Sequence, residues 1–409
     1  MFVQIHMLQS MPPSNLNRDD SGQPKKCIFG GVTRGRISSQ CLKRNIRLSP
    51  YFQEAFGESV ATRTKYLPRL VAEAVRAAGT IPASELDGIK AGIAAQFKKE
   101  TKAEEQEGDE ETSATDITPQ LVFFQPAFAA KIAALLADLR KKHPDAYKRF
   151  IGEKVKLSKD DQKAADEAIQ NFRDAALKAK ESLSVDVGLF GRMTTSDIIA
   201  DVEAACQVAH AISTHATLIE SDYFTAMDDL QSQYVTSQTQ SGGAAFLGSG
   251  DTETFFNAAV YYKYLNIDTD GLLKNLGDGD AKKVCRAAGV MVEASALATP
   301  TGKQNSFAAH SVPEFVLVEV SHRKQPISYA NAFLRPVEGD DLMRASVDSM
   351  SDYCGSVGAA FAPPGTKRFL LSVGRAKDAV FPLEASRVAT LAELVAAVET
   401  AVATVHAGA

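Results

Sequence analysis

The sequence predicts an α+β fold in which strands and helices occupy different parts of the chain. FVQIHML, at residues 2–8, has the near-alternation and apolar content of a β-strand. Residues 60–98 and 118–182 have helical patterning instead, clearest in AFAAKIAALLADLRKK. Strand-like segments return after residue 183. We therefore expect strands at the start and in the second half of the chain, with a helical insertion between them.

The first strand is expected to end in a loop. Within the strand, Val3, Ile5 and Met7 fall on one face, because strand side chains alternate. The next segment, QSMPPSNLNRDD at residues 9–20, contains a double proline. Proline neither continues a helix nor donates to a β-ladder, so this segment is predicted to be a loop.

A second extended segment leads into a short helix. If TRGRIS is extended, Arg34, Arg36 and Ser38 share one face of it. Residues 40–48 fit a helix, and either Ser38 or Ser39 is a good N-cap, because its hydroxyl can accept from a free backbone N–H.

The second half of the chain is predicted to contain strands and two further helices. VDVGLFGRMTTSD (185–197) resembles a strand followed by a tight turn, and IIADVEAACQVAHAIST (198–214) resembles an amphipathic helix. TFFNAAVYYKYLNID (254–268) and EFVLVEVS (314–321) are typical of strands. Residues 391–406 close the chain as an amphipathic helix.

Two segments have unusual charge content. Residues 98–116, KKETKAEEQEGDEETSATD, are charged and nearly free of bulky apolar residues, which is typical of a disordered surface insertion. From Leu230 to Gly250 the chain carries no charge at all, and it contains a Gly-Gly pair that favours a hairpin tip. A neutral polar excursion of this kind suits an arm that lies against another molecule.

Basic residues are concentrated at the start of an acidic chain. The formal net charge is −5, yet the first 50 residues hold eight basic residues against two acidic ones, a local charge of +6. The basic residues are Arg18, Lys25, Lys26, Arg34, Arg36, Lys43, Arg44 and Arg47. On the predicted 40–48 helix, Gln40, Lys43, Arg44 and Arg47 form one stripe without an interleaved carboxylate. Such a cationic patch on an anionic body predicts an anionic partner.

The sequence does not support catalysis, a cofactor or a metal site. The five cysteines are scattered without a C-x-x-C pair, which predicts reduced thiols. His210 and His215 are five residues apart, so they cannot share a metal as a helical i,i+4 pair can. Phosphate-loop and dinucleotide-binding motifs are missing from the sequence. No apolar run approaches membrane-spanning length, so we expect a cytoplasmic protein without a membrane partner.

A polar loop adds to the basic segment. TPTGKQNSF (299–307) places one cation and two amides, Lys303, Gln304 and Asn305, in a loop that suits phosphate or base-edge hydrogen bonds.

Several blocks together resemble a known family. SNLNRDD, CIFGGVTRGRISSQCLKRNIR, GRMTTSD, AHAISTH, YFTAMDDLQ and TGKQNSFAAHSVPEFVLVEVS resemble, in this order, the CasC family, the backbone subunit of the type I-E CRISPR effector complex Cascade. The combination of IFGG, RISSQ, LKR and GRM is specific. The acidic insertion at 98–116 matches nothing in that pattern.

The resemblance implies a hand-like architecture. An RRM-like, ferredoxin-type palm would comprise residues 1–50 and 183–409, with a β-hairpin thumb near 215–260. Residues 51–182 would form a helical finger insertion. In this family, copies stack head-to-tail along one guide RNA and present it for pairing with target DNA. The implied partners are the CRISPR guide RNA, target DNA through the guide, copies of the chain itself and other Cascade subunits.

The resemblance also implies which residues contact the guide. Most lie in the basic block, and Met193 of the GRM motif would act as an apolar wedge against a base, with a core methionine as the alternative. The full predicted set is Arg18, Lys25, Arg34, Arg36, Ser38, Ser39, Gln40, Lys43, Arg44, Arg47, Met193, Lys303, Gln304 and Asn305.

Two other functions remain open at this point. The chain could be a ferredoxin-like RNA endonuclease that processes CRISPR repeat transcripts, with His6 or His215 as general acid or base. It could also be an assembly protein whose basic patch binds an acidic protein.

Overall fold

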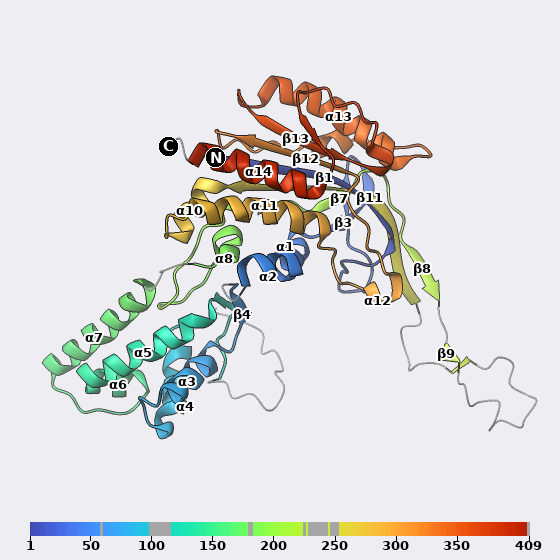
Figure 1. Ribbon diagram of the computed structural model, residues 1–409. Helices are drawn as coiled ribbons and strands as arrows, with labels where there is room; N and C mark the ends of the chain where they lie inside the picture. The colour runs from blue at the N-terminus through green and yellow to red at the C-terminus, as the bar shows by residue number, and fades with distance from the viewer. Residues whose placement is uncertain are drawn as a thin grey trace, which may run out of the picture. The chain divides into compact units, whose positions relative to one another are not determined.

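The computed structural model describes residues 1–57, 60–97, 116–178, 183–223, 226–227, 244–245 and 253–406 (Figure 1). The chain divides into two compact units. The first, here called the sheet unit, comprises Met1–Phe52, Val208–Asn266 and Ala288–Ala409. The second, the helical unit, comprises Gln53–Gln207 and Ile267–Ala287.

The sheet unit is built on one large sheet. Its strands and helices are β1 (Phe2–Ser14), β2 (Lys26–Phe29), β3 (Val32–Ile37), α1 (Ser39–Leu48), β7 (Ala211–Ser213), β8 (Glu220–Tyr223), β9 (Ala226–Met227), β10 (Ala244–Ala245), α12 (Gln304–Phe307), β12 (Phe315–Ser321), η3 (Ala330–Phe333), α13 (Leu342–Phe361), β13 (Lys367–Ser372), η4 (Gly374–Ala376), β14 (Ser386–Val388) and α14 (Leu391–His406). The elements α2 (Pro50–Phe56), β6 (Cys206–Val208), β11 (Glu253–Asp268) and α11 (Ala281–Leu297) have residues in both units.

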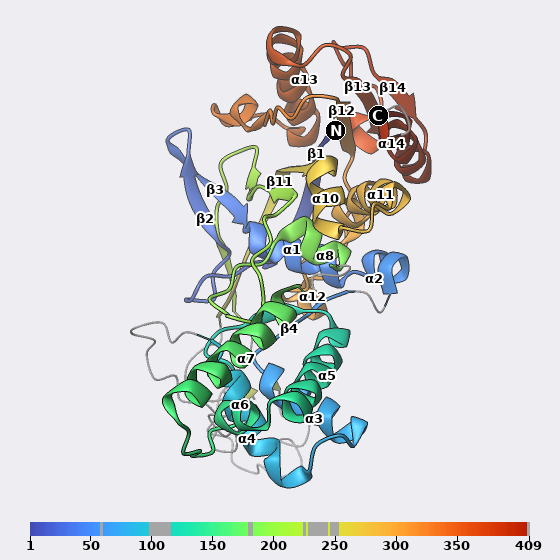
Figure 2. The same cartoon turned by 90° about the vertical axis from the view of Figure 1, so that its left-hand side faces the viewer.

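The strand order places the N-terminal strand in the middle of the sheet. The order is β14-β13-β12-β1-β11-β7-β3-β2, and β6 and β8 also pair with β11. Strand β1 pairs antiparallel with β12, from Phe2 opposite Ser321 to Leu8 opposite Phe315. Helix α13 lies on one face of the sheet and α14 on the other (Figures 1 and 2). Because both faces are covered, every residue from Phe2 to Leu8 is buried, and not only Val3, Ile5 and Met7 on their shared face.

Strand β1 is also longer than predicted. It continues to Ser14, through Pro12 and Pro13, which were expected to lie in a loop. These prolines are exposed and lie beyond Leu8, the last residue that pairs with β12. At that position a missing N–H costs no hydrogen bond of the β1–β12 ladder.

An antiparallel ribbon occupies the region predicted as the thumb. Phe255 of β11 lies opposite Ser221 of β8, and Ala244 of β10 lies opposite Met227 of β9. The uncharged stretch from residue 230 to 250 lies outside the described residues, apart from β10. The acidic segment 98–116 also lies outside them, apart from its last residue.

The helical unit packs its helices around a separate apolar core. Its own elements are β4 (Thr62–Thr64), α3 (Leu67–Ala78), η2 (Ala83–Glu85), α4 (Leu86–Ala94), β5 (Val122–Phe124), α5 (Pro126–Lys142), α6 (Pro144–Phe150), α7 (Lys159–Lys178), α8 (Val185–Phe190) and α10 (Thr269–Leu276). Val71, Ile89, Leu136 and Phe172 are among the buried side chains that join helices α3 to α7. None of the helices in the described ranges is long and apolar enough to cross a membrane.

The structure corrects two predicted elements. VDVGLF is helix α8, not a strand, and it ends at Gly191, whose φ is 76°. Residues 198–214 contain no helix, and their second half forms the short strands β6 and β7. The backbone there bonds to β11: the N–H of Ala209 donates to Tyr264 O, and Tyr261 lies opposite Ser213. Tertiary pairing here overrides a helical sequence pattern. The predicted strands at 254–268 and 314–321 and the helix at 391–406 are confirmed.

The boundary between the units also differs from the predicted one. Residues 183–207 and 267–287, predicted as palm, belong to the helical unit. Helix α8 packs there on α10, and a Cβ added at Gly188 would lie 2.9 Å from Leu272 Cδ1. The buried carboxylate of Asp186 accepts from the N–H of Ala61, which ties α8 to the chain that precedes β4.

Candidate nucleic-acid interface

Helix α1 presents the predicted cationic stripe to solvent. Ser38 caps the helix, since its hydroxyl accepts from the N–H of Cys41 at 3.4 Å. Leu42 and Ile46 are buried on the inner face. On the other face Gln40 and Arg44 are exposed, and Ser39, Lys43 and Arg47 are half-buried. The first turn of α1 contains no acidic residue, and its last turn contains Arg47.

The loop between β1 and β2 is held against the start of α1. Asn17 Oδ1 accepts from the N–H of Ser38 at 2.8 Å, and Asn17 O accepts from the N–H of Lys25 at 2.9 Å. The Asp19 carboxylate accepts from the N–H groups of Ser21 and Gln23. This loop therefore has a defined path that places Arg18, which is exposed, and Lys25 in the same surface region as α1.

Arg34 is not part of that surface, which corrects the prediction that it contacts the guide. Its side chain has 0% exposed area. Its guanidinium donates to three backbone carbonyls: Phe29 at 3.3 Å, Ser213 at 3.1 Å and Phe333 at 2.7 Å. Burial lowers the pKa of this guanidinium. Arg34 is a structural residue that joins the β2–β3 hairpin to two distant parts of the sheet unit.

Arg36 is half-buried and lies beside His210, which the sequence analysis considered only as a metal ligand. Its Nη1 lies 3.1 Å from Nδ1 of His210, which is exposed in the turn between β6 and β7. Burial lowers the pKa of His210, and the charges of Arg36 and Lys25 lower it further. Arg36 and Lys25 therefore both lie close enough to His210 to act on its charge. We call Arg18, Lys25, Arg36, Lys43, Arg44 and Arg47 the cationic surface.

The polar loop near residue 303 lies against the same part of the sheet unit. A Cβ added at Gly302 would be 2.5 Å from the carbonyl oxygen of Leu16, so this loop packs closely on the segment that leads to Arg18. Lys303 is half-buried with a positive φ of 54°, and Asn305 is exposed. Gln304 differs from expectation, because its amide donates to Pro300 O at 3.0 Å and thereby shapes the loop.

Met193 lies in the helical unit and projects into solvent. Its side chain is 91% exposed, which excludes the core position considered from the sequence. Arg192, the preceding residue, anchors the segment by donating to Ala200 O and Phe123 O, both at 2.9 Å. Burial lowers the pKa of Arg192 to about 10. The large apolar side chain of Met193 is thus exposed next to a half-buried arginine whose hydrogen bonds fix the backbone.

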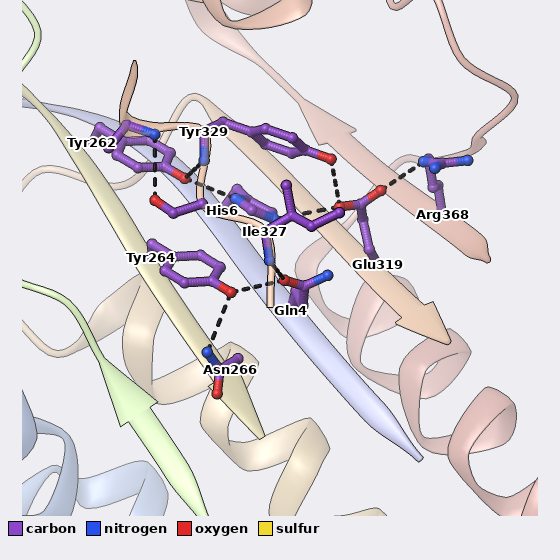
Figure 3. A network of polar contacts seen from close by, with 11 residues as sticks. Gln4, His6, Tyr262, Tyr264, Asn266, Glu319, Ile327, Tyr329 and Arg368 are labelled. Atoms are coloured by element: carbon purple, nitrogen blue, oxygen red, sulfur yellow. Dashed lines mark hydrogen bonds and ion pairs between the residues drawn. The ribbon is translucent and has the colours of Figure 1, made fainter. Parts of the chain in front are cut away.

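His6 is enclosed in a buried polar cluster of the sheet unit. Figure 3 shows His6 between Tyr262, Tyr329 and Glu319. His6 Nδ1 is 2.9 Å from the Tyr262 hydroxyl, and His6 Nε2 is 3.5 Å from Glu319 Oε2. Glu319 also accepts from Tyr329 at 2.8 Å and from Arg368 at 2.7 Å. We call these five residues the His6 cluster. Because His6 has 0% exposed area, its imidazole cannot reach an RNA bound at the surface.

His215 is likewise occupied by the fold. Its Nε2 accepts from the N–H of Val260 at 3.1 Å, and its Nδ1 lies 2.8 Å from the carbonyl oxygen of Ala216. Burial lowers the pKa of His215. Neither histidine named for the endonuclease function is therefore placed to act on a surface-bound phosphodiester. Among the described residues, no three His, Cys, Asp or Glu side chains are grouped as metal ligands would be.

One known family and several solved structures contain chains similar to this one. The family model described as CT1975-like protein (Cas_CT1975) matches residues 3–397. The chain is similar to a chain of the structure "CRISPR RNA-guided surveillance complex, pre-nicking", with 29% identity and a TM-score of 0.75 over 98% of this chain and 100% of that one. A chain of a "CRISPR RNA-guided surveillance complex" is similar at 25% identity, with a TM-score of 0.65 over 97% and 100%. None of the curated proteins matches.

Proposed function

Because the chain belongs to the family of CT1975-like Cas proteins, we propose that it is a non-catalytic subunit that binds the CRISPR guide RNA in a surveillance complex. In this role, copies of the chain polymerise head-to-tail along the guide, as predicted for the CasC backbone subunit of type I-E Cascade. They present the guide for pairing with target DNA and contact other subunits of the complex. The two similar solved chains, each covered over its full length, support this proposal.

The observation that carries the proposal is the cationic surface of the sheet unit. Its members come from the loop after β1, from β3 and from α1, so one backbone framework fixes all of them. A single-stranded RNA has a regularly spaced line of phosphates, which suits a surface of this kind without any reading of base sequence. Met193, exposed on the helical unit, supplies an apolar contact of the type that can press against a base.

The burial of His6 and His215 favours this function over the endonuclease. A general acid or base must lie within hydrogen-bond reach of its substrate. Both histidines instead bond to the protein's own groups and are largely or wholly enclosed.

Salt dependence of RNA binding tests the electrostatic mechanism. If six or seven phosphates are neutralised, the slope of log K against log[salt] for single-stranded RNA is expected to be about −4 to −5. Lys43→Glu combined with Arg44→Glu should weaken binding at least tenfold at low salt and make the slope shallower by about 1.4. Fluorescence anisotropy with a labelled oligoribonucleotide measures both quantities.

A matched pair of charge reversals provides the control. Lys367 and Lys377 are exposed on and just after β13, which is separated from β3 by several strands of the sheet. Lys367→Glu with Lys377→Glu makes the same change in net charge and should leave both affinity and slope nearly unchanged. Equal effects of the two pairs, or a slope near zero in the unmodified protein, would contradict the proposed binding surface.

A further inference from the structure

Two large apolar side chains of the sheet unit are exposed at one place. Ile28 is 71% exposed and Leu218 is 83% exposed, and both line a hollow of about 650 Å³. We call it the hairpin groove. One wall is the β2–β3 hairpin, with Cys27, Ile28 and Thr33. The opposite wall is the segment 217–221 together with Phe255 of β11.

The groove is built on paired backbone and therefore has a fixed shape. Ile28 lies opposite Thr33 in the hairpin, and Phe255 lies opposite Ser221. The N–H of Thr217 donates to Thr33 O at 3.1 Å, which joins the two walls at their base. The hairpin tip is equally constrained, because a Cβ at Gly30 would collide with the carbonyl of Leu334.

The lining has the chemistry of a nucleotide site. Ile28, Leu218 and Phe255 offer apolar surface to the flat face of a base, while the Gln23 amide and the Thr33 hydroxyl offer hydrogen bonds to its edge. Lys26 is exposed at the rim, next to Lys25 of the cationic surface. No carboxylate is found among the described lining residues. An occupant should therefore combine an apolar ring with an adjacent negative charge.

We propose that the hairpin groove receives a nucleobase of the same RNA strand whose phosphates bind the cationic surface. This inference rests on the proposed function. It adds a contact with a base of the RNA to the contacts that the cationic surface makes with the RNA phosphates. An apolar segment of a second copy would fill the hollow but would leave the positive charges of Lys25 and Lys26 without a partner. RNA offers a base that can pack on the apolar lining and phosphates that can bind the positively charged rim.

The test compares RNA with a ligand that lacks bases. Ile28→Ala with Leu218→Ala removes exposed apolar surface, so the variant should fold normally, which circular dichroism verifies. With oligouridylate, its Kd should rise about fivefold to twentyfold, because each large side chain loses most of its contact with the base. With an abasic ribose-phosphate oligomer of equal length, the Kd should be unchanged. Val380→Ala, at a side chain that is 77% exposed on another part of the sheet unit, should alter neither Kd.

A second measurement uses the thiol in the groove. Cys27 is half-buried there, and burial raises its thiol pKa, so it should react slowly with maleimide in the free protein. Oligouridylate should slow the reaction further, and the abasic oligomer should protect Cys27 much less.

The outcomes separate this inference from the proposed function. Equal loss of affinity for both ligands, or no loss for either, overturns the base contact while the salt slope and the Lys43/Arg44 reversal still support RNA binding. A change in self-association of the Ile28/Leu218 variant without RNA, measured by sedimentation, assigns the groove to a second copy and also overturns the inference. Failure of the Lys43/Arg44 reversal to affect RNA binding overturns the proposed function itself.

Discussion

Arg34 and Arg36 stand two residues apart on β3, yet only Arg36 reaches solvent. The segment that contains Phe333 covers the first guanidinium and accepts from it, whereas Arg36 lies beside the exposed ring of His210. Strand alternation places both side chains on one face, but alternation contains no information on what covers that face. A buried arginine without a carboxylate partner is stable here because backbone carbonyls satisfy its donors.

Arg34→Ala should therefore destabilise the protein without a direct effect on a ligand site. The change leaves three carbonyls unpaired and creates a cavity, so we expect the free energy of unfolding to fall by about 2–4 kcal/mol. Arg44→Ala, at an exposed position on α1, should change it by less than about 0.5 kcal/mol. Urea denaturation followed by tyrosine fluorescence measures both. Comparable stability of the two variants would contradict the structural role of Arg34.

At the scale of the element, α1 depends on a cap that the sequence identified as one of two serines. Ser38 is in the extended conformation and accepts from Cys41, while Ser39 is the first helical residue. Ser38→Ala should cost about 1 kcal/mol of stability, because a helix N-terminal N–H loses its partner. Ser39→Ala is the matched control and should cost little. Equal losses in thermal or urea unfolding would show that the cap is not the source of the effect.

Elements whose own residues show one clear hydrophobic or charge pattern could be predicted from the sequence. Elements whose structure depends on packing against residues far away in the chain could not. EFVLVEVS is rich in apolar and β-branched residues, and its residues 315–321 form strand β12, in which every residue is buried. VDVGLF is just as apolar but too short for periodicity to separate helix from strand, and its packing on α10 decides for a helix. The cationic stripe on α1 followed from 3.6-residue spacing, and the exposed Gln40 and Arg44 confirm its orientation. The position of His210 beside Arg36 depends on contacts between segments far apart in sequence.

At the scale of the whole molecule, the His6 cluster joins strands β1, β11, β12 and β13 of the sheet unit through buried charges (Figure 3). Burial alone would raise the Glu319 pKa. Hydrogen bonding to His6 and the charges of His6 and Arg368 outweigh that effect, so the pKa is held below its ordinary value. A carboxylate of this kind stabilises the folded state above the pKa it has when unfolded, and that stabilisation is lost as pH falls through its folded pKa.

Glu319→Gln should accordingly have a pH-dependent effect. At pH 7 it removes the negative charge that faces Arg368 and an oxygen that accepts from Tyr329 or Arg368, and it should lower the free energy of unfolding by about 3 kcal/mol. As pH falls through the lowered pKa of Glu319, the wild-type carboxyl becomes protonated, so the difference between the two proteins should shrink. Urea midpoints at several pH values between 7 and 3 provide the comparison. A difference that stays constant over this range would exclude Glu319 as a source of acid sensitivity.

The central position of β1 has a consequence for synthesis of the chain. Phe2 pairs with Ser321, and the helices that close the two faces of β1, Leu342–Phe361 and Leu391–His406, follow later still. This apolar strand is therefore synthesised well before the strand and helices that bury it, and residues 53–207 of the helical unit are made in between. Late pairing of this kind exposes a strand to aggregation. During translation, β1 is therefore a segment that needs protection by a chaperone until β12 and the two covering helices have been made.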